Sequence, residues 1–195
     1  MEDDVSVPGP ARLVRDFVNT HEPQTGAETW STPTELREWL AERRLVHGDA
    51  QLRPADLATA VTVREGLRSV LLEHAGQSAE ATAVQALNEA LAGLPLRITF
   101  GEQGYRLVSA SSTPIGHALG QVADAIRQSN EDGTWPRLKV CARDSCHWAF
   151  YDASRNQVRR WCSMAGCGNH IKMRRAYAAR KVRAQQAPAE ASRQR

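Results

Sequence analysis

The sequence predicts a mainly α protein with one β-hairpin, an α+β fold. A helical N-terminal domain precedes a small four-cysteine module and a basic C-terminal helix. Three observations indicate this: helical spacing of apolar residues recurs over residues 11–127, one pair of alternating runs flanks a glycine-containing turn, and all four cysteines lie in the last third. We expect domains at residues 1–132 and 135–186, followed by a disordered tail at 187–195.

Helix signals divide the N-terminal part into segments. Ser31-Thr-Pro-Thr before Glu35 is typical of a helix start, with proline at an early position. Pro54 and Pro114 begin two further segments of helical spacing, which end near His74 and Arg127. The helices expected in this part are 11–20, 31–40, 54–74, 81–91 and 114–127.

One hairpin interrupts this helical pattern. Two runs of alternating residues, 96–100 and 105–109, flank the segment 101–104, which contains two glycines. Alternation of period two is typical of a strand with one covered face, and glycine permits the tight turn between two such strands. We therefore expect a β-hairpin here and polar, helix-breaking chain at 129–134.

Charge is strongly segregated along the chain. Residues 137–195 contain 14 Lys and Arg against three acidic residues, whereas the preceding part contains 11 against 19. The net charge of +3 hides this division. A local excess of this size is typical of a surface that binds a polyanion. No stretch approaches the length of about 18 apolar residues that a membrane helix requires, so we expect a soluble cytoplasmic protein with no membrane partner.

The four cysteines form two close pairs. Each pair encloses four residues, and 15 residues separate Cys146 from Cys162. In a reducing compartment, clustered thiols hold a metal more often than they form disulfides. Two ligands from each of two turns suit a tetrahedral ion, and thiolates suit zinc. We therefore predict Zn²⁺ as cofactor, with the ligands Cys141, Cys146, Cys162 and Cys167.

Other residues near the cysteines have alternative interpretations. His147 or His170 could replace one sulfur ligand, although four thiolates make that unnecessary. Trp148, Phe150 and Trp161, with Tyr151, could stack on unpaired bases. A small metal module has little other core, however, so we expect the aromatic rings to form it. Buried free cysteines and redox-active thiols remain the alternatives to a metal site.

The cysteine region resembles a known family. The segment LKVCARDSCHWAFYDASRN, from Leu138, and the segment RRWCSMAGCGNH, from Arg159, are similar to the CGNR zinc finger. The run DFVNT from Asp16 and the Trp39-Leu40 pair are similar to the opening of the ABATE domain, which precedes this finger in bacteria. The resemblance implies a stress-responsive transcription regulator with four cysteine ligands and a finger that contacts DNA. His170 stands where that family has arginine, and a neutral histidine would contact phosphate more weakly.

DNA is the predicted partner, because Lys and Arg release counterions from phosphates. Residues 169–186 lack proline and glycine and should form one helix, with Ile171, Ala178 and Val182 as an apolar seam that docks it on the body. We expect Met173 and Tyr177 to belong to the core or to an interface and not to base readout. Arginines of the inter-pair loop could read guanine or bind phosphate; alternatively they are solvated or pair with the acidic N-terminal domain. The predicted nucleic-acid residues are Arg155, Arg159, Arg160, Lys172, Arg174, Arg175, Arg180, Lys181 and Arg183.

The N-terminal domain carries weaker functional signals. Asn19, Thr20 and His21 form a polar run that, with Arg68, could line a pocket for a small-molecule effector. Helix caps and surface polar groups are the alternative. A sensing or homodimerising role follows only from the family resemblance.

Three functions are therefore weighed. Transcription regulation through DNA binding is the expected one, and an RNA- or protein-binding zinc module is the alternative. A zinc enzyme would require three protein ligands and an exchangeable water, which four thiolates do not leave room for. We expect no catalytic residues.

Overall fold

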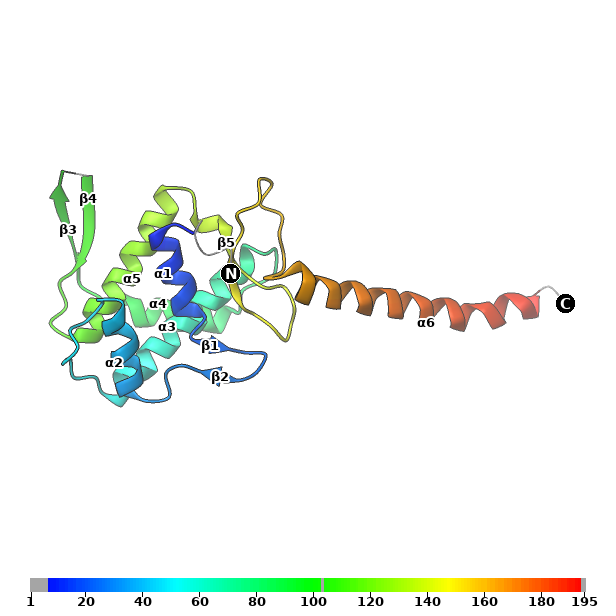
Figure 1. Ribbon diagram of the computed structural model, residues 1–195, viewed down its shortest axis with the longest axis horizontal. Coiled ribbons are helices and arrows are strands. Elements are labelled where there is room, and N and C mark those ends of the chain that lie inside the picture. The colour runs from blue at the N-terminus through cyan, green and yellow to red at the C-terminus, as the bar shows by residue number, and fades with distance from the viewer. Residues whose placement is uncertain (1–6, 103, 194–195) are drawn as a thin grey trace.

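The computed structural model describes residues 7–102 and 104–193, without the side chains of Val182 and of residues 184–193. Figure 1 shows a helical body from which the last helix projects. The elements in chain order are α1 (Gly9–Val18), β1 (His21–Glu22), β2 (Ala27–Glu28), α2 (Pro33–Glu42), α3 (Pro54–Glu73), α4 (Ala81–Ala92), β3 (Leu96–Gly101), β4 (Gly104–Ser109), α5 (Pro114–Glu131), η2 (Trp135–Arg137), β5 (Leu138–Val140), β6 (Ala149–Tyr151), η3 (Met164–Gly168) and α6 (Asn169–Arg193). The predicted α+β class is confirmed.

Local sequence determines where the helices begin. At α2, the Glu35 amide donates to the Thr32 hydroxyl at 3.2 Å, and the Thr32 amide donates to the Glu35 carboxylate at 2.8 Å. This reciprocal pair satisfies two amides that the first turn leaves without partners. α5 continues four residues beyond the predicted end at Arg127. The Arg127 guanidinium explains the extension, because it pairs with Asp124 and Glu131 one turn away on either side, at 2.7 and 2.5 Å.

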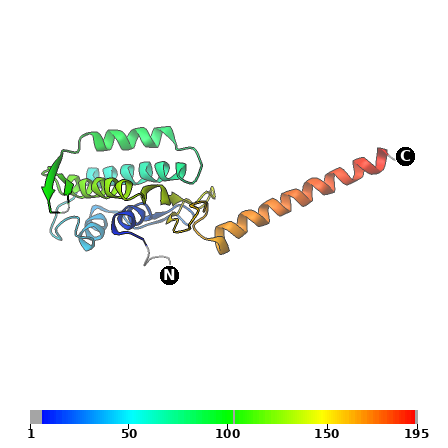
Figure 2. The same ribbon diagram turned by 90° about the horizontal axis from the view of Figure 1, so that it is seen from above.

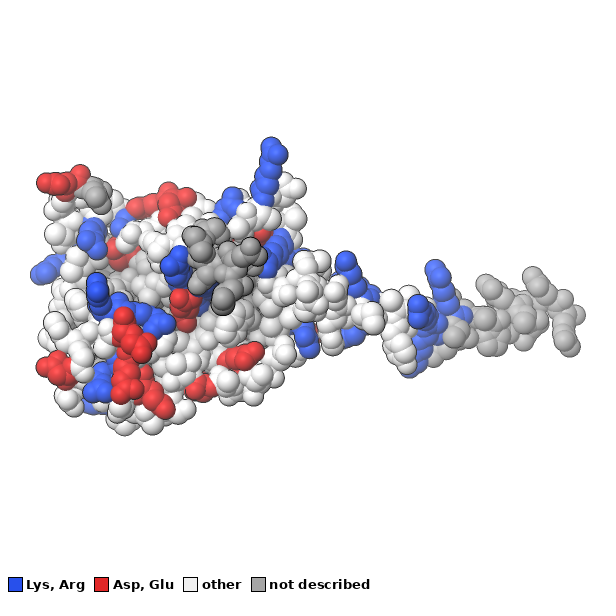
Figure 3. All heavy atoms as spheres, in the orientation of Figure 1, with Lys and Arg blue, Asp and Glu red and all other residues white. Residues whose placement is uncertain are grey.

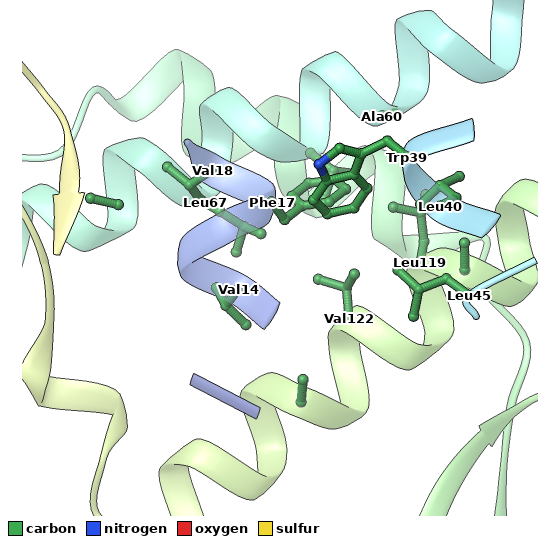
Figure 4. Packing of buried hydrophobic residues seen from close by; sticks show 14 of the residues in the cluster. Val14, Phe17, Val18, Trp39, Leu40, Leu45, Ala60, Leu67, Leu119 and Val122 are labelled. Carbon is green, nitrogen blue, oxygen red and sulfur yellow. The ribbon is translucent and has the colours of Figure 1, made fainter. Parts of the chain in front are cut away.

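The core lies between layers of helices. Figure 2 shows α4 as an outer layer over α3, with α1 and α2 on the other side of α3 and α5. α4 lies very close to α3 at Gly66, where an added Cβ would come within 2.4 Å of the Leu87 Cβ. Three aromatic rings, Phe17, Trp30 and Trp39, pack with centroids 5.1 to 5.9 Å apart. Figure 4 shows Phe17 and Trp39 among the aliphatic residues of α1, α3 and α5.

Three two-stranded antiparallel sheets occur in the described part of the chain. The predicted hairpin is β3 with β4, with Ile98 opposite Leu107 in the register. The pairs β1/β2 and β5/β6 were not predicted, because strands of two or three residues are too short to show alternation. The β5/β6 pair matters for function, since it carries the first two cysteines.

The cysteine region is continuous with the N-terminal domain. Leu138, Val140 and Ala149 are buried in the same hydrophobic cluster as α1 and α3. The boundary predicted near residue 133 therefore falls within one packed body.

The last helix does not dock on that body. α6 contacts η3 and then projects away from the body (Figure 1). Ala178 of the predicted apolar seam is exposed, Ile171 is half-buried, and the Val182 side chain lies outside the described residues. Burial of Ile171 and Ala178 alone would remove too little apolar surface from water to offset the desolvation of the surrounding Lys and Arg side chains. The backbone of α6 continues to Arg193, through most of the predicted tail; residues 194 and 195 lie outside the described part.

Candidate metal centre and basic surface

The first cysteine pair lies in the connection between β5 and β6. The two strands pair with Val140 opposite Ala149, and the Cys141 amide continues the ladder by donating to the Trp148 carbonyl at 2.9 Å. The Cys146 amide closes the turn on the Arg143 carbonyl at 2.8 Å. A short hairpin thus places both sulfurs at one end.

The second pair lies at the entrance to α6. Cys162 precedes η3 and Cys167 lies within it. The Ser163 hydroxyl accepts from the Gly166 amide at 3.1 Å, and the Ser163 carbonyl accepts from the Gly168 amide at 2.9 Å. A backbone hydrogen bond of 2.8 Å from Ala142 to Arg160 brings this segment against the first pair.

The structure brings all four cysteines together. Their sulfur atoms lie within 4.8 Å of one another. The Sγ atoms of Cys146 and Cys162 are 3.7 Å apart, and those of Cys162 and Cys167 are 3.8 Å apart. Four sulfurs at about 2.3 Å from a tetrahedral ion would be separated by about 3.8 Å. The cluster therefore fits a metal ion with four thiolate ligands.

Electrostatics of the cluster also favour a cation. Hydrogen bonds from the Cys146 and Cys162 thiols lower the pKa of Cys141. The resulting interaction with Cys141 raises the pKa of Cys146, and interactions with both neighbours raise the pKa of Cys162. One thiolate therefore forms easily while the next ones are disfavoured, and a bound cation would stabilise all four.

Further side chains enclose the cluster. Arg143 Nη1 lies 3.8 Å from the Cys167 sulfur, where its charge offsets that of a thiolate. Trp148 and Trp161 pack against the buried cysteines, as expected, whereas Tyr151 packs against the main core and Phe150 is buried. The contact of Arg143 could not be predicted from the sequence, because it follows from the fold of the turn.

A buried ion pair holds the loop between the cysteine pairs. Asp152, whose side chain is 0% exposed, accepts from Lys139 Nζ at 2.9 Å and from the backbone amides of Ser154 and Arg159. Burial raises the pKa of this carboxyl, but hydrogen bonds from Ser154 and Lys139 outweigh burial and the pKa lies below its ordinary value. Lys139 also donates to the Gln157 carbonyl at 2.5 Å. These bonds fix the base of the loop.

Side chains of α1 and α3 hold the first cysteine pair. The Asn19 amide donates to the Ala149 carbonyl and accepts from its amide, both at 2.8 Å. Arg68 Nη1 donates to the His147 carbonyl at 2.8 Å, and Nη2 donates to the Val18 carbonyl at 2.6 Å. Gln77 donates to the Ala142 carbonyl at 2.9 Å. The N-terminal domain therefore binds the backbone on both sides of Cys146.

The predicted effector residues do not form one pocket. Asn19 and Thr20 line a cavity of about 380 Å³, with Trp39, Trp148 and Cys162. Arg68 is buried, with its guanidinium bound to carbonyls and to Glu65, and does not line that cavity. His21 also lies outside the cavity, with its Nδ1 atom 3.7 Å from Oε1 of Glu65. Two of the four residues thus face a cavity between α1 and the metal centre.

The predicted nucleic-acid residues fall into two groups. Arg159 is half-buried: its Nε donates to the Trp161 carbonyl at 2.9 Å, its Nη2 donates to the Cys162 carbonyl, and its guanidinium lies over the Phe150 ring. Its first role is to hold the second cysteine pair. The exposed group contains Arg155, Arg160, Lys172, Arg174, Arg175, Arg180, Lys181 and Arg183. None of this group forms an ion pair with another described residue.

Among the described residues, none of the helices combines the length and the apolar composition that a membrane span requires.

The family comparisons cover most of the chain. Residues 137–181 match the model of the CGNR zinc finger. Residues 11–139 match the ABATE model, described as "Putative stress-induced transcription regulator". A search of curated proteins found no match. The chain therefore belongs to the ABATE family and carries a CGNR zinc finger at its C-terminal end.

Proposed function

We propose that the chain is a transcription regulator that binds duplex DNA through its basic C-terminal region, and that Zn²⁺ is the ion of the four-cysteine centre. The observation that carries this proposal is α6, which leaves the metal centre and presents six basic side chains to solvent between Lys172 and Arg183. On the face seen in Figure 3, Lys and Arg side chains lie along the described part of the helix with no acidic side chain among them, whereas the body carries both signs.

The described contacts make these charges available to a partner. The alternative that the loop arginines pair with the acidic N-terminal domain is not supported, since Arg155 and Arg160 form no ion pair among the described residues. The described basic residues of α6 form none either, and the main contact of this helix is with η3. Each phosphate that they neutralise would release condensed counterions. Arg155 and Arg160, exposed on a loop whose base Asp152 holds, extend the same basic surface to the body.

Fluorescence anisotropy of the zinc-loaded full chain against duplex DNA and matched RNA tests the proposal. With up to eight phosphate contacts, log K should fall with log salt with a slope of about −4 to −7. Replacing Arg174, Arg180 and Lys181 with glutamine should reduce the magnitude of the slope by about 2 to 3. The matched control, Arg97→Gln with Arg106→Gln, changes exposed arginines of the β3/β4 hairpin at the far end of the body and should leave it unchanged (Figure 1).

Two results would contradict the proposal. A flat salt response would exclude phosphate binding. Tighter binding to the matched RNA would favour the alternative of an RNA-binding module.

We further propose a structural role for the zinc and no enzymatic activity. Four thiolates complete a tetrahedral shell, which leaves no position for a reacting water. The absorption spectrum of the cobalt-substituted chain tests this. A tetrathiolate spectrum that azide or cyanide leaves unchanged is expected, and a shift on adding either anion would indicate an open coordination position.

An effector-sensing role of the N-terminal domain completes the proposal. The cavity beside Asn19 and Thr20 also reaches Cys162, so a small ligand there would touch both α1 and the metal centre. A thermal-shift screen of the wild type and of a Thr29→Trp variant, which narrows this cavity, tests the assignment. Compounds that stabilise only the wild type support it, and compounds that stabilise both equally place the ligand elsewhere.

A further inference from the structure

Two large apolar side chains are exposed on the basic helix. Met173 is 74% exposed and Tyr177 is 73% exposed, although they lie on a helix whose described neighbours are mostly Lys, Arg and Ala. They are four residues apart and therefore neighbours on one face. The sequence led us to expect core or interface roles for both, and the body does not cover them.

Helical geometry groups them with basic residues. At 100° per residue, one sector of about 120° contains both apolar side chains. The exposed residues of this sector are His170, Met173, Arg174, Tyr177, Arg180 and Lys181. Arg175 lies on the opposite side, and Ala178 and the half-buried Ile171 lie between it and the edge of the sector. We name this sector, defined by the six exposed residues, the Tyr177 face.

We propose that the Tyr177 face enters the major groove of duplex DNA, and that Met173 and Tyr177 contact base edges there, including thymine methyl groups. This inference rests on the proposed DNA binding and assigns the residues that discriminate among sequences. The major groove admits an α-helix, and apolar contact with the thymine C5-methyl group is a recognised means of reading sequence. Charged residues on the flanks of the same face would contact the phosphates on either side.

Other occupants fit this face less well. A second copy of α6 would bring Arg174, Arg180 and Lys181 against the same charges, which would oppose pairing. An anionic lipid surface requires a wide apolar face, and only two large apolar side chains are exposed among the described residues of α6. Double-stranded RNA has a deep, narrow major groove that side chains cannot read. Duplex DNA matches both the charge and the exposed apolar groups.

The experiment compares sequence discrimination with overall affinity. The zinc-loaded full chain is used to select a preferred duplex from a randomised pool. The ratio of Kd for a scrambled duplex to Kd for the selected duplex is then measured at fixed salt. We expect a ratio of at least a hundredfold for the wild type, and a loss of about tenfold in Met173→Ala and in Tyr177→Ala. Tyr177→Phe, which keeps the ring, should retain most of the ratio.

Two controls separate base reading from charge and from general exposure. Lys172→Gln lies outside the Tyr177 face and should weaken both duplexes equally, so the ratio should not change. Phe100→Ala removes a side chain that is 81% exposed on β3, at the other end of the body, and should change neither affinity.

Each contrary outcome is distinct. Unchanged ratios in both alanine variants would overturn the inference. A wild-type ratio near one would also overturn it, while leaving the proposed phosphate binding intact. No binding of the wild type to any duplex would overturn the proposed function together with the inference. Binding to phosphatidylserine vesicles that Tyr177→Ala abolishes, with an unchanged DNA ratio, would assign the face to lipid.

Discussion

The two cysteine pairs differ in what holds them. The backbone around Cys141 and Cys146 is bound by side chains of α1 and α3, and the flanking strands are part of the main core. By contrast, no hydrogen bond or ion pair joins residues 162–168 to the N-terminal domain among the described residues; their contacts stay within the module, through Arg143, Arg159 and the sulfurs.

This difference assigns separate roles to the two halves of the metal centre. The first pair is prearranged by the protein, so its geometry should persist without metal. The second pair leads into α6, and hydrogen bonds of Ala142, Arg143 and Arg159 hold its segment within the module. A metal ion shared by the four sulfurs would add a direct link between this segment and the first pair, and so between the N-terminal domain and the basic helix that we propose to bind DNA.

The largest effect is expected from Arg68→Ala. Removal of a buried guanidinium takes away the donor to the carbonyls of Val18 and His147 and one of the two guanidinium partners of Glu65, so the free energy of unfolding should fall by about 3 to 5 kcal/mol, with or without zinc. Urea unfolding measures this. Arg53→Ala, whose side chain pairs with Asp56 but is 72% exposed, is the control and should lower the free energy of unfolding far less. An equal loss of unfolding free energy in the two variants would contradict the role of Arg68 in holding the first cysteine pair.

Asn19→Ala should have the next largest effect. It removes both hydrogen bonds to the backbone of Ala149. Because Ala149 is only 1% exposed, water cannot replace them, and the zinc-free chain should be destabilised by about 1 to 3 kcal/mol. Asn19→Asp keeps an acceptor for the Ala149 amide but places a carboxylate oxygen against the Ala149 carbonyl, so it should not restore the lost stability. A loss of stability that appears only in the zinc-loaded chain would show that the metal, and not α1, arranges the first pair.

Arg143→Ala addresses the second pair. The guanidinium lies beside the Cys167 sulfur, so its removal should weaken zinc binding about tenfold while the zinc-free chain keeps its stability within about 0.5 kcal/mol. Competition with a chromophoric chelator measures the affinity. Arg155→Ala, an exposed change on the nearby loop, should leave the affinity unchanged. Destabilisation of the zinc-free chain by Arg143→Ala would place the second pair in the same prearranged unit as the first.

The smallest effect concerns acid sensitivity of the N-terminal domain. Burial raises the pKa of Glu28, but hydrogen bonds from Arg64 and from the Trp30 amide outweigh it, and the net pKa is lowered. The stabilisation is therefore fully present above the unfolded value of about 4.3 and is lost as the pH falls through the lower folded value. The difference in unfolding free energy between the wild type and Glu28→Gln should shrink below about pH 4. Acid also releases zinc, but it does so from both chains and therefore cancels in this difference. A difference in unfolding free energy that does not change with pH would contradict the lowered pKa of Glu28.

Local signals in the sequence predicted much of this architecture. The Thr32 and Glu35 pair marked the start of α2, and glycines between alternating runs marked the β3/β4 hairpin. The spacing of the cysteines predicted the cluster that the structure assembles. These signals act over a few residues or follow from ligand chemistry, and so are visible without a fold.

Long-range contacts could not be predicted in this way. Asn19 binds a backbone 130 residues away, and Arg68 binds one 79 residues away; neither leaves a periodic pattern. The polar run that follows the first helix indicates an effector pocket from the sequence alone, whereas in the structure both side chains bind backbone groups. Likewise, Arg159 could not be distinguished from Arg155 and Arg160 by charge alone, although only Arg159 binds the carbonyls beside Cys162.

Hydrogen exchange of the full chain, with zinc bound and after chelation, tests the central claim most directly. The Cys141 and Ala149 amides, bound to Trp148 and Asn19, should remain protected after chelation. The Gly168 amide, bound to Ser163 beside the second pair, should exchange at least about tenfold faster. Equal loss of protection in both halves, or none in either, would contradict the account.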